Sequence, residues 1–332
     1  MRQVLQSSAE PSRAANEPRF MQVHHDDPAA DREALLAGLR APQARVPPKY
    51  FYDALGSKLF EAITELTEYY PTRTEAAIFD SHGAAIAGHI GPGVTLVDLG
   101  AGNCAKAERL FPLLELRRYV AVDISVDFLR TAVRRIAREH PRLEVAGLGL
   151  DFSASLALPA GLADGRRVFF YPGSSIGNFA PAEALALLRQ IRAQCDGGGL
   201  LIGVDLVKPV AVLEAAYDDA LGVTAAFNLN LLRHLNHLIG SDFDPASWRH
   251  VAFFDTQASR IEMHLEARSQ QPVHWRGGER VFRSGERIHT ENSYKYSAAD
   301  FQALLMQAGF GAVSHWTDQQ GWFGVFWAPA GH

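Results

Sequence analysis

Cysteine is scarce in this chain, because only Cys104 and Cys195 occur among its 332 residues. Two cysteines are too few for the disulfide framework of a small secreted protein, and they are typical of a reducing compartment. No apolar run reaches the roughly 18 residues that a membrane-spanning helix needs, and the amino terminus lacks the apolar segment of a secretory signal. We therefore expect a cytoplasmic protein with no membrane partner.

The chain also lacks an excess of positive charge. It has 32 Lys and Arg residues against 37 Asp and Glu residues, which gives a formal net charge of −5. Nucleic acids attract proteins with clustered basic residues, and here these residues are scattered. No nucleic-acid partner is expected, and we predict a monomer that acts on a small molecule. The 13 histidines form no cluster with metal-ligand spacing, so no metal site is predicted.

What the chain does contain is a long alternation of short apolar runs and helical patterns. Apolar runs predict strands over residues 94–98, 119–123, 143–150, 167–171 and 200–206. Helical patterns separate them over residues 105–114, 126–139 and 181–194, and Pro112 is placed to kink the first of these helices or end it early. This alternation predicts a doubly wound α/β sheet.

Other patterns flank this alternating region. Helices are predicted over residues 31–39, 50–63, 75–86 (capped by Thr72 or Thr74), 211–219, 223–238 and 298–308. Residues 249–264, 273–275 and 281–289 are rich in strand formers, and residues 1–28 have the composition of a disordered tail. Two closing strands, 311–318 and 322–327, are joined by only three residues, Gln-Gln-Gly, which predicts an antiparallel hairpin.

A glycine turn after the first of the alternating strands predicts a nucleotide site. Residues 96–103 read LVDLGAGN, and Gly100 and Gly102 let the backbone pass close to a ligand. Asp123 ends the next strand, 23 residues after Gly100. An acid about 20 residues after such a turn binds ribose hydroxyls in nucleotide-binding βαβ units. The turn by itself fits a nicotinamide dinucleotide as well as a methyl donor.

Three further features favour S-adenosylmethionine as the cofactor. The final hairpin gives the sheet an antiparallel last strand, as in Rossmann-like methyltransferases. Asp151 and Phe152 directly follow the third strand, where a carboxylate suits the adenine amine and a ring suits the adenine face. No second nucleotide-binding half follows Leu206. Lys106, at the start of the first helix, is a candidate partner for the methionine carboxylate of this donor.

Longer motifs in the chain resemble one enzyme family, the histidine-specific Nα-methyltransferases of ergothioneine biosynthesis. The resemblance runs in order over about residues 45–328. It rests on PKYFYDA (48–54), YYPTRTE (69–75), GSSIGN (173–178), DLVK (205–208), AYDD (216–219), GVTAAFN (222–228) and TENS (290–293). Within the wider family, the TENS motif is the part that indicates histidine.

This resemblance implies a Rossmann-like class I methyltransferase domain and a smaller α+β substrate domain. The first would comprise residues 74–209 and 296–332, and the second residues 29–73 and 210–295. The reaction would be three successive methyl transfers from S-adenosylmethionine to the α-amine of L-histidine, giving trimethylhistidine (hercynine). The implied cofactor-binding residues are Gly100, Gly102, Lys106, Asp123, Asp151, Phe152 and Gly173.

The resemblance also implies the substrate site. Its members would be Tyr52, Tyr69, Asn178, Tyr217, Thr224, Met263, Glu291 and Ser293. Tyr52 and Asn178 would hold the substrate carboxylate, and Glu291 and Ser293 the imidazole. Positions 291 and 293 of a strand share a face, so both side chains can reach one ring. Glu291 accepts an N–H and a close carboxylate favours imidazolium, whereas Ser293 can donate or accept.

Aromatic residues near the amino terminus supply faces for a methylated amine, which loses N–H donors and keeps a positive charge. These residues are Phe51, Tyr52, Phe60, Tyr69 and Tyr70. Tyr52 is also the one candidate for the base that removes the amine proton. The alternative function is an N-methyltransferase of the same family that acts on another aromatic amino acid or amine. Glu291 and Ser293 disfavour an indole substrate, because indole offers a single N–H.

Overall fold

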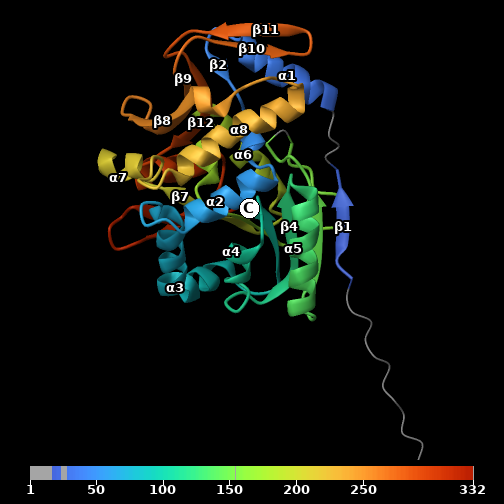
Figure 1. Ribbon diagram of the computed structural model, residues 1–332. Coiled ribbons are helices and arrows are strands. Elements are labelled where there is room, and N and C mark those ends of the chain that lie inside the picture. Colours follow the sequence, from blue (N-terminus) through green and yellow to red (C-terminus); the bar gives the residue numbers. More distant parts are fainter. Residues whose placement is uncertain (1–16, 24–27, 154, 332) are drawn as a thin grey trace, which may run out of the picture.

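An eight-stranded sheet organises the larger part of the molecule in the computed structural model, which describes residues 17–23, 28–153 and 155–331. Its strand order is β1-β5-β4-β3-β6-β7-β14-β13 (Figure 1). The strands are β1 (Arg19–Gln22), β3 (Val94–Leu99), β4 (Leu116–Asp123), β5 (Glu144–Gly149), β6 (Arg167–Tyr171), β7 (Gly199–Asp205), β13 (Ser314–Thr317) and β14 (Phe323–Pro329).

Strand directions in this sheet confirm the predicted fold class. All neighbours from β1 to β7 pair in parallel, whereas β14 is antiparallel to β7 and β13 is antiparallel to β14. The closing hairpin predicted from its three-residue link is therefore present. Parallel strands covered on both sides are expected to be continuously apolar, and β3 and β7 are buried at every position.

Helices cover both faces of the sheet. Side chains alternate along β3, so that Val94 and Leu96 pack on one side and Val97 and Leu99 on the other. The first side holds α3 (Tyr70–Ile90), α4 (Ala105–Glu108) and α5 (Val126–Glu139), and the second holds α6 (Pro181–Gln194) and α9 (Ala298–Gln307). Among the described residues, no helix is both long and apolar enough to cross a membrane.

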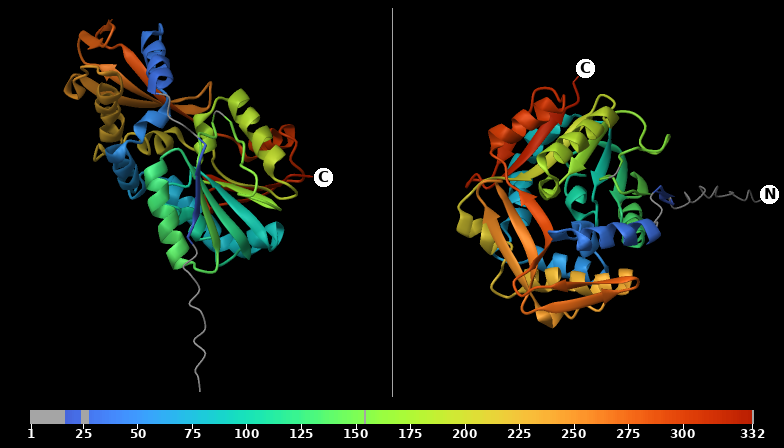
Figure 2. Two further views of the ribbon diagram at one scale, coloured as in Figure 1. Left: turned by 90° about the vertical axis from the view of Figure 1, so that its right-hand side faces the viewer. Right: turned by 90° about the horizontal axis from the view of Figure 1, so that it is seen from above.

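A second hydrophobic core is formed by residues 35–70 together with residues 213–288 (Figure 2). A four-stranded sheet has the order β2-β12-β9-β8, and β10 pairs with β11 in a separate ribbon. These strands are β2 (Ala44–Arg45), β8 (Trp248–Asp255), β9 (Arg260–Ala267), β10 (Gln271–Trp275), β11 (Gly278–Phe282) and β12 (Arg287–Tyr294). The residue limits expected for the two domains stay a prediction.

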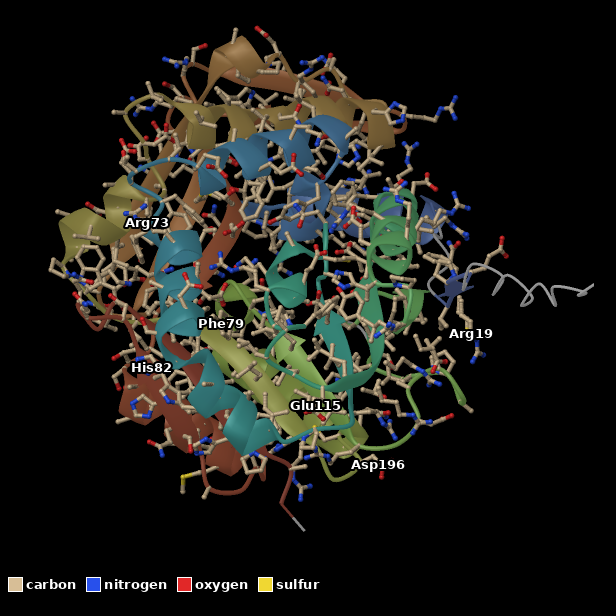
Figure 3. The ribbon with its side chains drawn as sticks, turned by 90° about the horizontal axis from the view of Figure 1, so that it is seen from below. Arg19, Arg73, Phe79, His82, Glu115 and Asp196 are labelled. Atoms are coloured by element: carbon tan, nitrogen blue, oxygen red, sulfur yellow. The ribbon has the colours of Figure 1, made fainter. Side chains whose placement is uncertain are left out.

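Six helical segments of the described chain accompany this second core. They are α1 (Pro28–Arg40), η1 (Pro48–Phe51), α2 (Ala54–Thr64), α7 (Val210–Ala215), α8 (Val223–Ile239) and η3 (Pro245–Ser247). Leu35 and Leu39 of α1 share a core with Leu231 and Leu235 of α8, although nearly 200 residues separate them. Figure 3 shows the molecule from below, at the end where β4 and β7 begin. Glu115 directly precedes β4, and Asp196 lies shortly before β7.

The structure corrects part of the disordered tail expected over residues 1–28. Residues 19–22 form β1, which lies parallel to β5 at the edge of the large sheet. Gly147 of β5 makes room for Phe20, because a Cβ at Gly147 would lie 2.7 Å from the Phe20 ring. The Arg130 guanidinium carbon lies over that ring, 3.8 Å from its centroid. Residues 1–16 and 24–27 lie outside the described residues.

Four helix predictions were wrong in their limits. The helix expected over residues 211–219 is α7, which ends at Ala215. Helix α3 begins at Tyr70 with Pro71 in its first turn, so neither Thr72 nor Thr74 caps it. Helix α4 ends at Glu108 rather than Leu114, because the ring of Pro112 would clash with the carbonyl four residues earlier. The helix expected over residues 50–63 is interrupted between η1 and α2.

Candidate active site

The carboxyl ends of β3 to β6 form one edge of the large sheet, where open α/β sheets bind ligands. Gly100 and Gly102 follow β3 with φ angles of 68° and 52°, in the left-handed region that favours glycine. A Cβ built on either residue would meet no atom within 4 Å, so open space lies beside this turn. The turn thus presents bare backbone to open space.

Asp123 fixes the shape of this glycine turn. Its Oδ2 accepts the N–H of Gly102 at 2.9 Å, and its Oδ1 accepts the N–H of Ser125 at 2.8 Å. A carboxylate has about four lone-pair positions. Asp123 therefore retains acceptor capacity for ribose hydroxyls while it holds two loops in register.

Lys106 lies beside Gly173 and pairs with Glu75. The Lys106 Nζ is 2.8 Å from Glu75 Oε2, and Glu75 Oε1 accepts the Gly173 N–H at 2.8 Å. A Cβ at Gly173 would lie 2.8 Å from the Lys106 Nζ. Sequence reasoning gave no role to Glu75, although it ends the YYPTRTE motif. Its buried carboxylate joins α3, α4 and the loop after β6.

Asp98 presents a second buried carboxyl at the end of β3. Burial raises its pKa to about 7, although a hydrogen bond from Tyr119 acts in the opposite direction. Tyr119 donates to Oδ2 at 2.7 Å, whereas Oδ1 has no hydrogen-bond partner among the described residues. Buried polar atoms are nearly always paired, so this orphan oxygen is consistent with a partner supplied by a ligand.

Asp151 and Phe152 follow β5 as expected. Asp151 Oδ1 accepts the Ser153 N–H at 3.1 Å, and Lys49 Nζ approaches Oδ2 at 3.8 Å. The Phe152 ring packs edge to face on Tyr171 with centroids 5.6 Å apart. Both residues therefore lie at the carboxyl edge of the sheet, after the strand next to β4, which ends at Asp123, and two strands from the glycine turn after β3.

A pocket between the two sheets brings together all eight residues proposed for the substrate. It is lined by Tyr52, Phe60, Ile63, Tyr69, Gly173, Ser174, Ser175, Asn178, Ala216, Tyr217, Thr224, Phe227, Met263, Glu291 and Ser293. Gly173 also touches Lys106, so the pocket adjoins the cofactor side of the sheet. The Thr224 hydroxyl is buried here without a hydrogen-bond partner among the described residues.

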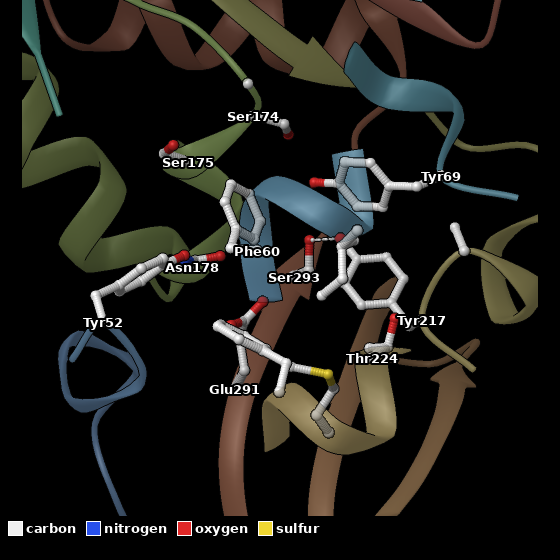
Figure 4. Close-up of a pocket in the computed structure, with 15 residues that line it drawn as sticks. Tyr52, Phe60, Tyr69, Ser174, Ser175, Asn178, Tyr217, Thr224, Glu291 and Ser293 are labelled. Atoms are coloured by element: carbon white, nitrogen blue, oxygen red, sulfur yellow. Dashed lines mark hydrogen bonds between the residues drawn. The ribbon is translucent and has the colours of Figure 1, made fainter. Parts of the chain in front are cut away.

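Glu291 and Ser293 project from β12 into this pocket (Figure 4). Met263 stands opposite Glu291 on β9, and the pairing register shifts between His289 and Glu291. Burial raises the pKa of Glu291 to about 7, whereas the charge of Lys295 acts to lower it. The pocket thus has a carboxyl group that a ligand N–H can stabilise in its ionised form.

Aromatic rings form one wall of the pocket. The Phe60 centroid lies 5.7 Å from that of Tyr52 and 6.2 Å from that of Tyr69. Although 38% of Tyr52 is exposed, burial of its hydroxyl raises the pKa well above the ordinary value, followed by the charge of Glu291. The raised pKa favours the protonated phenol, and the candidate role of Tyr52 as base stays a prediction.

Two of the aromatic residues singled out from the sequence lie elsewhere. Phe51 stacks on Phe227 with centroids 4.6 Å apart and does not line the pocket. Tyr70 donates its hydroxyl to the buried Asp205 at 2.7 Å. The break between η1 and α2, where Asp53 accepts the Gly56 N–H at 2.6 Å, sends Tyr52 toward the pocket and Phe51 into the core.

A buried charge network behind the pocket was missed in the sequence. Asp205 pairs with both Lys208 and Lys295, and all three side chains are at most 1% exposed. Burial opposes ionisation of Asp205, but these two lysines hold its pKa below the ordinary value. Lys295 follows Glu291 and Ser293 at the same two-residue interval, which is the one sequence signal that could have indicated it.

Comparison with known proteins identifies the family. A family of histidine-specific, S-adenosylmethionine-dependent methyltransferases matches residues 31–330. This chain belongs to that family.

Individual members agree with this assignment. A histidine N-alpha-methyltransferase of Mycolicibacterium smegmatis is 41% identical over 308 residues, which cover 90% of this chain and 95% of that protein. Its counterpart in Mycobacterium tuberculosis is 38% identical and covers 89% of this chain and 93% of its own length. Ergothioneine biosynthesis protein 1 of Neurospora crassa is 32% identical over 82% of this chain, but over only 32% of that longer protein.

The residues at the sheet edge fit the cofactor of this methyltransferase family. The open space beside Gly100 and Gly102 admits a ligand close to the backbone. Asp98 Oδ1 is a buried acceptor that lacks a partner among the described residues, and one N–H of Lys106 is used by Glu75 while the side chain stays 41% exposed. An acceptor and an ammonium at one edge complement the amino and carboxylate groups of a methionine moiety.

Proposed function

We propose that this chain transfers methyl groups from S-adenosylmethionine to the α-amine of L-histidine. Three successive transfers would give trimethylhistidine (hercynine), a step of ergothioneine biosynthesis. Membership of the histidine-specific family and similarity to two mycobacterial enzymes over nine-tenths of the chain support this reaction. The observation that carries it is the single pocket holding Glu291 and Ser293 together with Tyr52 and Asn178.

Each end of histidine has complementary groups in this pocket. Glu291 and Ser293 offer oxygen atoms to the two imidazole nitrogens. Tyr52 and Asn178, which line the same pocket (Figure 4), offer an O–H and an amide N–H₂ to the α-carboxylate. Binding a substrate at both ends fixes the amine between them, and such positioning supplies much of the rate of a transfer reaction.

We assign the cofactor to the glycine turn and the residues around it. Asp123 would bind the ribose hydroxyls, Asp151 and Phe152 the adenine, and Lys106 with Gly173 the methionine end. When bound, S-adenosylmethionine supplies an electrophilic methyl group. Gly173 contacts both Lys106 and the substrate pocket, so its loop separates the two ligands by little more than backbone.

The pocket wall suits an amine whose charge becomes permanent. Tyr52, Phe60 and Tyr69 present ring faces and edges instead of carboxylates, and each well-placed ring stabilises a cation by about 0.5–2 kcal/mol. Because the raised pKa of Tyr52 favours its protonated form, we propose that the amine proton leaves to water and that the pocket binds the neutral amine.

We further propose a cytoplasmic monomer. Cys104 and Cys195 are both free and buried, as is typical of proteins in a reducing compartment. The monomeric state is a prediction from the sequence alone.

Mass spectrometry of the product tests the function directly. Purified protein with S-adenosylmethionine and L-histidine should yield a species heavier by three methyl groups, and L-tryptophan under the same conditions should give little product. Preferential methylation of tryptophan would support the alternative, a family member acting on another aromatic amino acid. Methylation on an imidazole nitrogen would contradict the assignment to the α-amine.

A further inference from the structure

Ser293 is the only pocket side chain in the described structure that receives hydrogen bonds from both a buried ammonium and a buried phenol. Lys295 Nζ donates to Ser293 Oγ at 2.7 Å, and the Tyr217 hydroxyl donates to the same oxygen at 2.7 Å. A serine oxygen has two lone pairs and one hydrogen. With both lone pairs used, its hydrogen is left for a partner on the pocket side.

Lys295 sets the direction of its own bonds, because an ammonium can only donate. Lys295 has three N–H groups and no acceptor, and they point to Asp205 at 2.8 Å, Tyr217 at 3.0 Å and Ser293. The Tyr217 oxygen accepts from Lys295, and the Tyr217 hydroxyl hydrogen is the one donated to Ser293. Asp205 in turn is held by Lys208 and by Tyr70. The hydrogen bonds are therefore oriented so that Asp205 accepts from Lys295, and Lys295 and Tyr217 donate to Ser293.

We propose that Lys295 is a positioning residue that makes Ser293 a hydrogen-bond donor toward the substrate, so that the pocket selects neutral imidazole over imidazolium. Neutral imidazole has one N–H and one bare nitrogen, which match an acceptor at Glu291 and a donor at Ser293. Imidazolium has two N–H groups, so one of them would face the Ser293 hydrogen. This inference rests on the function proposed above.

The charge of Lys295 acts in the same direction as hydrogen bonding, whereas an ionised Glu291 acts against it by favouring imidazolium. The titratable groups around Ser293 come from several elements, namely Glu291 and Lys295 on or just after β12, Asp205 and Lys208 at the end of β7, Tyr217 after α7, Tyr70 on α3, and Tyr52 and Tyr69 before α2 and α3. Burial opposes the charge of Lys295, but Asp205 raises its pKa. Its ammonium therefore remains charged behind Ser293 and disfavours a second cation.

Lys208 provides a matched control within the same network. It also binds Asp205 and is as buried as Lys295, but its other partners are Tyr70 and the Leu206 carbonyl. Burial lowers its pKa to about 8. Lys295→Met and Lys208→Met each remove one ammonium from Asp205, and only the first removes a hydrogen bond to Ser293.

Binding of trimethylhistidine across pH tests the inference, because its α-nitrogen does not titrate. If only the neutral ring binds, and the ring pKa is about 6.5, the affinity of the wild type for trimethylhistidine should fall by about 30-fold from pH 7.5 to pH 5. The affinity of Lys295→Met for trimethylhistidine should fall by less than about threefold over the same pH range. The affinity of Lys208→Met should change with pH as that of the wild type does. Loss of Lys295 also raises the pKa of Glu291, so the protonation state of the ring, read by NMR, separates the two effects. Equal pH profiles for all three would overturn the role of Lys295.

Nitrogen-15 NMR of ring-labelled trimethylhistidine on the wild type provides a test that needs no variant. One protonated and one bare ring nitrogen are expected in the complex at pH 6, where the free ligand is mostly imidazolium. Two protonated nitrogens would overturn the inference and leave the proposed function intact. Failure of the wild type to bind this ligand or to methylate histidine would instead overturn the proposed function and the inference with it.

Discussion

Glu291 lies in an environment that opposes its own ionisation. Burial raises its pKa from 4.5 to about 7, and Lys295 offsets only part of this effect. A carboxyl whose pKa is raised by folding contributes stability that is full below pH 4.5 and is lost as pH rises through about 7. Above that pH the free protein keeps a buried carboxylate without a substrate to pair it.

Glu291→Gln removes this titration while keeping the size of the side chain. The free energy of unfolding of the variant minus that of the wild type should be larger at pH 8 than at pH 5. The increase should be up to about 3 kcal/mol, at 1.36 kcal/mol per pKa unit. Urea unfolding of both proteins at the two pH values measures the difference. Asp98 titrates in both proteins and cancels. Parallel pH dependences would show that Glu291 is not buried as described.

The two-residue period of a strand correctly predicted which side chains share a face. Positions 291 and 293 were expected to share a face, and both side chains line the pocket. The same two-residue step leads to Lys295, but burial of a lysine depends on the distant Asp205. Local sequence does not contain that partner, so the network behind Ser293 could not be predicted.

At the scale of elements, strong hydrophobic periodicity predicted the first and last residues of helices and strands well. Amino-acid composition alone did not predict β1. The limits of α5, α6 and β6 match those expected from the sequence. Strand β1 was missed because it has only four residues, two of them half-buried, and it gains its structure from pairing with β5. A short edge strand carries little pattern of its own.

Phe20→Ala tests whether β1 is held by its ring. The substitution removes the contact with Gly147 and the cation above the ring, and it should lower the free energy of unfolding by about 1–2 kcal/mol for a partly buried aromatic ring. Arg19→Ala, which removes one exposed hydrogen bond to the Gly161 carbonyl, should cost less than half as much. Urea unfolding measures both. The KM for histidine should change by less than twofold, and a large change would place β1 in the site.

At the scale of the whole molecule, Asp205 joins the two sheets through charge. It ends β7 of the large sheet and binds Lys295, which directly follows β12 of the small one. Tyr70 of α3 donates to it from a third side. The substrate pocket opens between these elements, so its geometry depends on how the two sheets meet.

Asp205→Asn should therefore destabilise the whole molecule. It leaves two buried lysines without a carboxylate, and loss of one partner of a buried ion pair costs about 3–5 kcal/mol. Asp196→Asn is the control, because its pair with Arg167 is 58% exposed on the aspartate side and is worth about 0–1 kcal/mol. Calorimetric melting compares the two. Similar melting temperatures for both variants would contradict a structural role for the network.

The sequence by itself determined the class of sheet, the antiparallel closing hairpin, the glycine turn with Asp123 and the family, because these depend on local periodicity and on motifs contiguous in the chain. Only the tertiary structure decided which side chains meet. It placed Tyr52 in the pocket and Phe51 in the core, paired Lys106 with Glu75, and set Lys295 between Asp205 and Ser293. Such contacts join residues up to hundreds of positions apart, and packing rather than local pattern selects them.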